Sequence, residues 1–191
     1  TWLDVTFAGG ELPPLAGGAP ASVVDAKPPV RENAPQTFFD FADKSLAETM
    51  FDGANGLAVT AEDGYVALRI TDNFDPYVSL VLGETDADAN RQMLICYRNH
   101  GESGRLGLYY CAGADEPFAY TAAHLTMGSL KTDADWHVAL VDFSDADGFA
   151  GKLKTLRIDP YDGLQEKVGD GIDIAWIAFV PADGRALDYA E

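Results

Sequence analysis

Acidic side chains with regular spacing are the first residues in this chain that could do chemistry. Asp86, Asp88 and Asn90 occupy every second position, as the first ligands of an EF-hand calcium loop do. The rest of that loop is missing, because Arg91 stands where a glycine is required and Tyr97 stands where a bidentate glutamate is required. We therefore reject an EF-hand.

Other aspartates gather in the turns between apolar runs. A structural calcium ion held by loop carbonyls and one or two carboxylates would suit this pattern, because Ca²⁺ prefers oxygen ligands. The alternative is that these aspartates only shape turns, which they do without a metal. The candidate calcium ligands are Asp72, Asp75, Asp142 and Asp170.

Motifs of the well-known catalytic classes are missing from the sequence. His100, His124 and His137 stand on different predicted elements and lack the spacing of metal-binding histidines. There is no nucleophile elbow of the G-x-S-x-G type, no phosphate-binding loop and no dinucleotide-binding glycine motif. A carboxylate pair for glycoside hydrolysis can always be chosen from 31 acids, so such a pair carries no weight. We expect no enzymatic activity.

Aromatic side chains are the second resource for recognition. Sugar rings present apolar C–H faces that stack on aromatic rings, while polar side chains bind the hydroxyl groups. The predicted carbohydrate-contacting residues are Tyr109, Arg98, Trp136, Tyr120 and Tyr161. For each of them, an ordinary core or surface position is the alternative. Burial of both Trp136 and Trp176, with no aromatic exposed on either sheet, would instead indicate a spacer domain.

Short β-strands are the elements that must position these residues. Three apolar runs, at 136–143, 153–158 and 172–180, are separated by breaks rich in glycine and aspartate. This spacing favours an antiparallel β-sandwich over alternating strands and helices. The Asp63-Gly64 pair predicts a hairpin between two of the remaining strands. We predict those strands at 37–41, 57–61, 65–71, 77–82, 93–98, 106–111 and 118–127, and one short helical turn at 43–50.

The strands at 93–98 and 106–111 are predicted to form a hairpin with Ser103 and Gly104 at its turn. Their register would place Arg98 opposite Tyr109 on the less apolar face of the hairpin. It would also place Cys96 opposite Cys111. The two cysteines would then form either a cross-strand disulfide or two buried thiols.

Residues 1–36 differ in composition from the rest of the chain. After a short alternating strand, six prolines exclude a regular helix and any central strand. The strand at 172–180 is apolar on both faces, so something must cover its outer face. We predict a Pro-rich N-terminal arm of residues 1–36 packed on a sandwich of residues 37–191. Alternatively, Trp176 lies in a ligand groove.

The charge balance narrows the choice of partners. Thirteen lysines and arginines against 31 aspartates and glutamates give a net charge of −18. A field of this sign repels phosphate groups, which argues against nucleic acid and anionic membranes as partners. No apolar run reaches the roughly 20 residues that a membrane-spanning helix needs. Because the chain begins at Thr1, we expect a monomeric module of a larger protein.

Several segments follow a pattern found in one known group of domains. They are DNFDPYVSL, WHVALVDFSD, LKTLRIDPYDG and GDGIDIAWIAFV. The segments resemble galactose-binding-like jelly-roll modules of secreted glycoside hydrolases and surface proteins of Gram-positive bacteria. The resemblance covers roughly residues 37–180. Its framework positions are Trp136, Asp142, Arg157, Asp159, Pro160, Gly169, Asp170 and 174–177.

The resemblance implies an all-β jelly-roll sandwich in an extracellular or cell-surface protein. It also implies non-catalytic carbohydrate binding, with a glycan or a surface protein as the partner. Since ligand residues vary within this group, no binding residue is carried over from it. The alternative function is a structural or adhesive spacer that binds no glycan.

Overall fold

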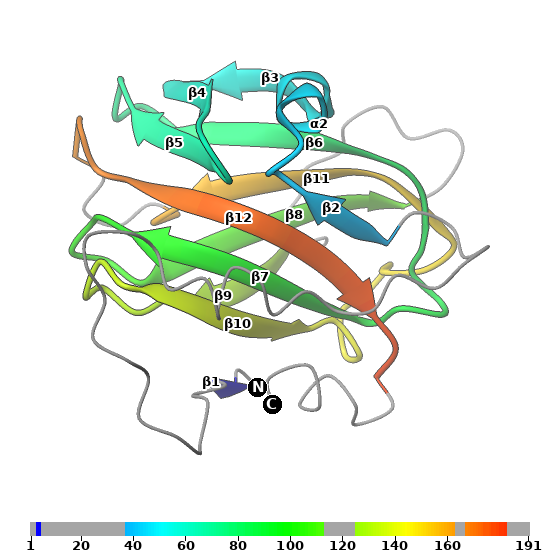
Figure 1. Ribbon diagram of the computed structural model, residues 1–191. Helices are drawn as coiled ribbons and strands as arrows, with labels where there is room; N and C mark the ends of the chain where they lie inside the picture. The colour runs from blue at the N-terminus through cyan, green and yellow to red at the C-terminus, as the bar shows by residue number, and fades with distance from the viewer. Residues whose placement is uncertain (1–2, 5–36, 113–124, 163–166, 183–191) are drawn as a thin grey trace, which may run out of the picture.

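The predicted apolar runs form strands in two antiparallel sheets that face each other (Figure 1). In this computed structural model, the described residues are 3–4, 37–112, 125–162 and 167–182. Sheet A has the order β1(Leu3–Asp4), β10(Trp136–Asp142), β7(Gln92–Asn99), β12(Gly171–Val180), β5(Val66–Ile70) and β4(Leu57–Ala61), with β2(Phe38–Asp40) also on β12. Sheet B has the order β3(Phe51–Asn55), β6(Tyr77–Asp86), β11(Lys152–Pro160), β8(Arg105–Ala112) and β9(Leu125–Ser129). The chain passes repeatedly from one sheet to the other, which gives the expected jelly-roll sandwich.

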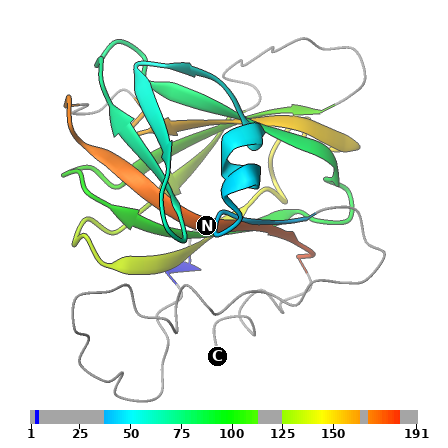
Figure 2. The ribbon, with the colours of Figure 1, turned by 45° about the horizontal axis from the view of Figure 1, so that its top comes forward.

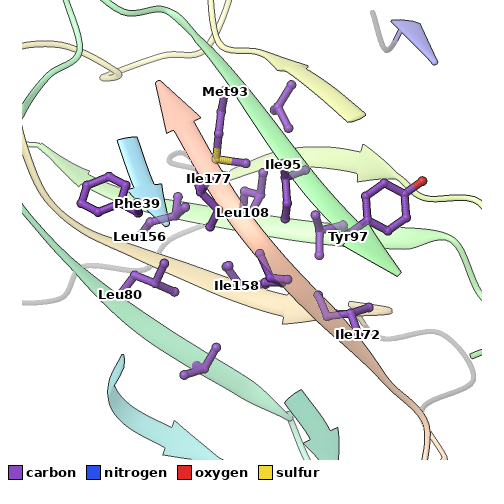
Figure 3. Packing of buried hydrophobic residues seen from close by; sticks show 14 of the residues in the cluster. Phe39, Leu80, Met93, Ile95, Tyr97, Leu108, Leu156, Ile158, Ile172 and Ile177 are labelled. Carbon is purple, nitrogen blue, oxygen red and sulfur yellow. The ribbon is translucent and has the colours of Figure 1, made fainter. Parts of the chain in front are cut away.

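Alternating side chains from both sheets fill the space between them. In β11, Leu153, Leu156 and Ile158 are fully buried in the main core, whereas Arg157 points to the other side of the sheet. Figure 3 shows Leu156 and Ile158 packed near Ile95 and Ile177 of sheet A. The core therefore forms along the whole interface between the two sheets.

A short helix closes one edge of the sandwich. Helix α2(Lys44–Met50) begins after Asp43, whose carboxylate accepts a hydrogen bond from the Ser45 backbone N–H at 3.0 Å. Ala47 and Met50 on its inner side belong to the main core. Figure 2 shows the helix standing between the two sheets next to β3 and β4. The predicted helical turn is confirmed, and Asp43 is its N-cap.

The hairpin predicted from Asp63-Gly64 is present, since β4 pairs with β5 from Leu57↔Ile70 to Ala61↔Val66. Gly64 has a φ of +90°, a conformation that residues with a side chain rarely adopt.

The predicted hairpin between the strands at 93–98 and 106–111 is wrong. Both strands exist, as β7 and β8, but they lie in different sheets. Asn99 shapes the connection between them, because its side chain donates to the Ser103 carbonyl at 2.9 Å and accepts from the Gly101 N–H at 2.9 Å. Cys96 and Cys111 are therefore on separate sheets, and both are buried thiols without a disulfide.

A β-bulge changes the faces of β12. Its register with β7 shifts between Ile174 and Trp176, so alternation is broken at Ala175. Ile172 and Ile174 contribute to the main core, but Trp176 lies on the other face, in a second apolar cluster with Val138 and Val180. All ten residues of β12 are buried, so its outer face is covered as expected. The predicted arm is described only at Leu3–Asp4, which pair with β10.

Candidate functional site

Two tyrosines and one arginine form a layer on the outer face of sheet B. Tyr77, Arg157 and Tyr109 come from the adjacent strands β6, β11 and β8, at positions that alternate with core residues. The Arg157 Cζ lies 3.8 Å from the centroid of the Tyr77 ring and 5.1 Å from that of Tyr109. Both tyrosines are half-buried. We call these three residues the tyrosine–arginine platform.

Two carboxylates fix the arginine in this layer. Asp159 accepts from Arg157 Nε at 2.7 Å and from Nη2 at 2.5 Å, and Asp75 accepts from Nη2 at 2.7 Å. Burial alone would lower the pKa of Arg157, but these hydrogen bonds and negative charges raise it. The guanidinium is therefore a permanent, well-oriented donor group.

Asp159 itself is almost fully buried. Burial raises its pKa to about 6, although hydrogen bonds and the charge of Arg157 act in the opposite direction. The carboxylates of Asp162 and Asp75 add to the upward shift. The site thus contains one acidic group that titrates near pH 6 in the folded protein.

The loop before β6 presents Asp75 to the platform. The Asn55 side chain donates to the carbonyls of Phe74 and Asp75 at 2.9 and 2.7 Å. The Asp72 carboxylate accepts from the Phe74 N–H at 3.0 Å. Asp75 has a positive φ of 49°, a conformation that this network holds in place. Phe74 in the same loop is 81% exposed.

A glycine lets the turn after β11 fold back over sheet B. A Cβ atom on Gly107 would lie 3.0 Å from Cβ and Cγ of Asp162 and 3.2 Å from Cβ of Asp159. A larger residue at position 107 would therefore require Asp162 or Asp159 to shift by a few tenths of an ångström. Asp162 lies 3.6 Å from Arg105 in an ion pair, which adds a further carboxylate beside the platform.

The structure separates the residues predicted to contact a carbohydrate. Tyr109 belongs to the platform, but Arg98 and Trp136 lie on the outer face of sheet A, on the other side of the sandwich. Tyr161 is fully buried, and its hydroxyl contacts the Asn99 side chain and the Gly171 carbonyl at 2.9 Å each, so it is a core residue. Tyr120 lies outside the described residues.

The four predicted calcium ligands do not gather at one place in the described part of the chain, although Asp72 and Asp75 share the loop before β6. Asp75 binds Arg157, and Asp142 accepts from Gln92 at 3.0 Å and from the Ser144 N–H at 2.8 Å. Asp72 shapes its own loop, and Asp170 precedes β12 in a separate turn. Among the described residues, no group of three or more histidine, cysteine or acidic side chains could hold a metal ion.

Sequence reasoning missed two platform members, Tyr77 and Arg157. A signal for each was present, because Val78 and Leu80 alternate with Tyr77, and Leu156 and Ile158 alternate with Arg157. That pattern assigns both side chains to the outer face. It does not reveal that β6, β11 and β8 are neighbours, which brings the three side chains into contact.

Comparisons with known proteins find likeness of fold only. The model is similar to a low-affinity xylan binding module, CBM86, from Roseburia intestinalis, with a TM-score of 0.50, 13% identity and coverage of 72% of this chain and 93% of that one. It is also similar to a family 29 carbohydrate binding module (TM-score 0.47, 16% identity, 68% of this chain and 78% of that one). A mutant of such a module complexed with cellulohexaose has a TM-score of 0.46 at 16% identity, and the similarity covers 68% of this chain and 80% of that one.

No family model and no curated protein matches the sequence. The likeness to the xylan binding module, at 13% identity, shows the class of fold alone: an antiparallel sandwich of the carbohydrate-binding-module type. The described residues contain no helix that is both long and apolar enough to span a membrane.

Proposed function

We propose that this protein is a non-catalytic carbohydrate-binding module that holds a glycan on the outer face of sheet B. The tyrosine–arginine platform is the observation that carries the proposal. Its tyrosine rings supply apolar surface for the C–H face of a sugar, and Arg157 and Asp75 supply a donor and an acceptor for hydroxyl groups. Burial is the first cause that raises the pKa of Tyr109, so its hydroxyl remains protonated and can donate at neutral pH.

The fixed geometry of the platform supports a binding role. Arg157 is held before any ligand arrives by Asp159 of its own strand and by Asp75 of the loop before β6, and its side chain is only 13% exposed. Preorganised groups lose little conformational entropy when a ligand binds. The platform therefore offers a rigid surface, as a module that binds polysaccharide in an extracellular or cell-surface protein requires.

The second candidate function is a structural or adhesive spacer. Burial of Trp176 and Trp136, which are 1% and 7% exposed, favours it. The half-buried Tyr77 and Tyr109 and the exposed Phe74 favour the binding module instead, because they leave aromatic surface accessible on the sheet B side. The two functions differ in one measurable property, which is retention on a neutral glycan.

Affinity electrophoresis and calorimetry on neutral polysaccharides such as xylan and on cello-oligosaccharides test the proposal. We expect Tyr77→Ala and Tyr109→Ala each to weaken binding by about tenfold while the melting temperature changes little. Phe38→Ala, which removes a half-buried aromatic ring from the sheet A side, is the matched control and should bind like the wild type.

If the wild type binds no member of a broad panel of neutral glycans, the proposal is contradicted and the spacer function is supported. Loss of folding in Tyr109→Ala would show that Tyr109 is a core residue. Each binding measurement is made with Ca²⁺ and again with EDTA. We expect equal retention, because no three acidic, histidine or cysteine side chains among the described residues form a metal-binding group. Retention lost in EDTA would show that a bound ion supports the site.

A further inference from the structure

The outer face of sheet A carries a second polar cluster, centred on Asp173 of β12. Its carboxylate accepts from Arg69 at 2.6 Å, from Arg98 at 2.9 and 2.6 Å, and from the His100 ring at 2.7 Å. These three partners come from β5, from β7 and from the residue that follows β7. The Asp173 side chain is completely buried beneath them.

The cluster has more positive than negative charge. Two guanidinium groups share the single carboxylate of Asp173, so one positive charge is not balanced within the ion pairs of the described residues. Burial would raise the pKa of Asp173, but hydrogen bonds from His100, Arg98 and Arg69 lower it, and the carboxylate stays ionised. Elsewhere the protein is strongly acidic, with a net charge of −18. The net negative charge of the chain accounts for its solubility, but it does not account for a local cluster of positive groups.

The cationic groups reach the solvent. The side chains of Arg69, Arg98 and His100 are 33%, 26% and 30% exposed. Arg98 uses Nε and Nη2 for Asp173, and no hydrogen bond of its Nη1 is found among the described residues. Arginine thus keeps donor capacity for a second anion on its outer edge.

Two aromatic rings stand beside this arginine. The Arg98 Cζ lies 4.9 Å from the Trp136 ring centroid and 5.4 Å from that of Tyr65, and the two rings meet edge to face at 5.6 Å. The Trp136 side chain also has a buried Nε1 that lacks a hydrogen-bond partner in the described structure. A buried donor without a partner costs free energy, so this side of the cluster has an unmet donor next to Arg98.

We infer that Arg98, Arg69 and His100, together with Tyr65 and Trp136, form a second binding site that takes the carboxylate of an acidic sugar. The guanidinium groups bind the carboxylate, and the half-buried Tyr65 ring contacts the sugar ring to which it is attached. Trp136 lies against Arg98 and helps to hold its guanidinium in place. The inference deepens the proposed function, because it adds a uronic-acid site to a carbohydrate-binding module. The two sites lie on opposite faces of the sandwich and use no residue in common.

Calorimetric titration of the full chain with oligogalacturonate tests the inference. The matched ligand is the same oligosaccharide with its carboxyl groups reduced to alcohols, which keeps the sugar and removes the charge. We expect the acidic ligand to bind about tenfold or more tightly than the reduced one, with affinity falling as salt rises. Equal binding of the two ligands, or binding of neither, would overturn the inference without any variant.

Two variants then assign the site. Arg98→Gln keeps an amide donor near Asp173 but removes the charge. We expect this variant to bind oligogalacturonate no more tightly than the reduced oligosaccharide. Tyr77→Ala should keep the preference, because it changes only the sheet B platform. If both variants bind oligogalacturonate like the wild type, the site is not on this face.

The design separates the two proposals. One result is that no form of the protein binds neutral glycans while the acidic ligand still binds more tightly than the reduced one. This result would overturn the platform proposal and support the Arg98 site. If the protein binds neutral glycans but binds the acidic and reduced ligands equally, the platform proposal is supported and the Arg98 site is overturned. Dextran sulfate is included, and binding to it as tight as to oligogalacturonate would show unspecific anion attraction, which also overturns the inference.

Discussion

Arg157 shows how one residue can serve both structure and recognition. Its guanidinium lies between two tyrosine rings and two carboxylates, so its position is determined before any ligand binds. Replacement by lysine would keep the charge but lose the planar fork that satisfies Asp159 through two nitrogens. The chemistry of the platform therefore depends on the residue type as well as on its charge.

Asp159 gives this site a pH dependence that unfolding can measure. Its pKa is about 6 in the folded protein and close to the ordinary value of about 3.9 in the unfolded chain. The folded state therefore binds the proton more tightly, and this contribution to stability is lost as pH rises from about 4 to about 6. We expect wild type to lose on the order of 2–3 kcal/mol relative to Asp159→Asn over that range.

Urea unfolding of both proteins between pH 4 and pH 7 provides the difference curve. Asparagine resembles the protonated acid and does not titrate, so other groups cancel in the comparison. A difference that instead grows in favour of the wild type with rising pH would mean that pairing with Arg157, rather than burial, controls Asp159.

At the scale of elements, β12 organises sheet A. It pairs with β7, β5 and β2, and its bulge at 174–176 turns Trp176 outward while Ile177 returns to the core. The bulge also leaves Asp173 on the outer face, where Arg69 and Arg98 reach it from the strands on either side. One strand therefore contributes to the core and to the second polar cluster.

The beginning of β12 depends on a close approach between backbones. A Cβ atom on Gly171 would lie 1.9 Å from the Leu68 carbonyl oxygen and 3.0 Å from the Arg69 Cα, so β12 and β5 would have to separate. We expect Gly171→Ala to destabilise the protein by about 1–3 kcal/mol in urea unfolding. Thr60→Ala, at an exposed position of the neighbouring β4, should change stability by less than about 0.5 kcal/mol. Equal midpoints for the two variants would contradict the steric argument.

At the scale of the whole molecule, the sandwich separates side chains that are close in sequence. Cys96 and Cys111 lie in different sheets, and each is buried. Burial raises the pKa of the Cys96 thiol, which suppresses the reactive thiolate. We expect a thiol reagent to label neither cysteine in the native protein and both in denaturant.

Reducing agent should leave the unfolding midpoint unchanged, since there is no disulfide to break. A non-reduced protein lighter by two hydrogens, or a midpoint that falls on reduction, would contradict this expectation. The same measurement tests the relative placement of β7 and β8, because only a hairpin would bring the two sulfur atoms close together.

The sequence by itself determined most of the strands, the hairpin at Gly64 and the short helix after Asp43, but it missed β3(Phe51–Asn55). These features depend on local patterns: alternation of apolar residues, turn residues with a positive φ, and a carboxylate that accepts a backbone N–H. Alternation also determined which side chains of β6 and β11 face outward. It made Tyr109 a surface candidate on the correct side of its own strand.

Only the tertiary structure decided which strands are neighbours. Two strands that follow each other in sequence can pair in one sheet or lie in different sheets, and their local sequence patterns are similar in both cases. β7 and β8 lie in different sheets. The bulge in β12 likewise has no clear local signal, because both faces of that strand are apolar. The order of the strands places Tyr109 beside Tyr77 and Arg157. The strand order and the bulge together place Arg98 beside Asp173 and Trp136. The physical reason is that packing across two sheets, rather than spacing along the chain, determines side-chain contacts.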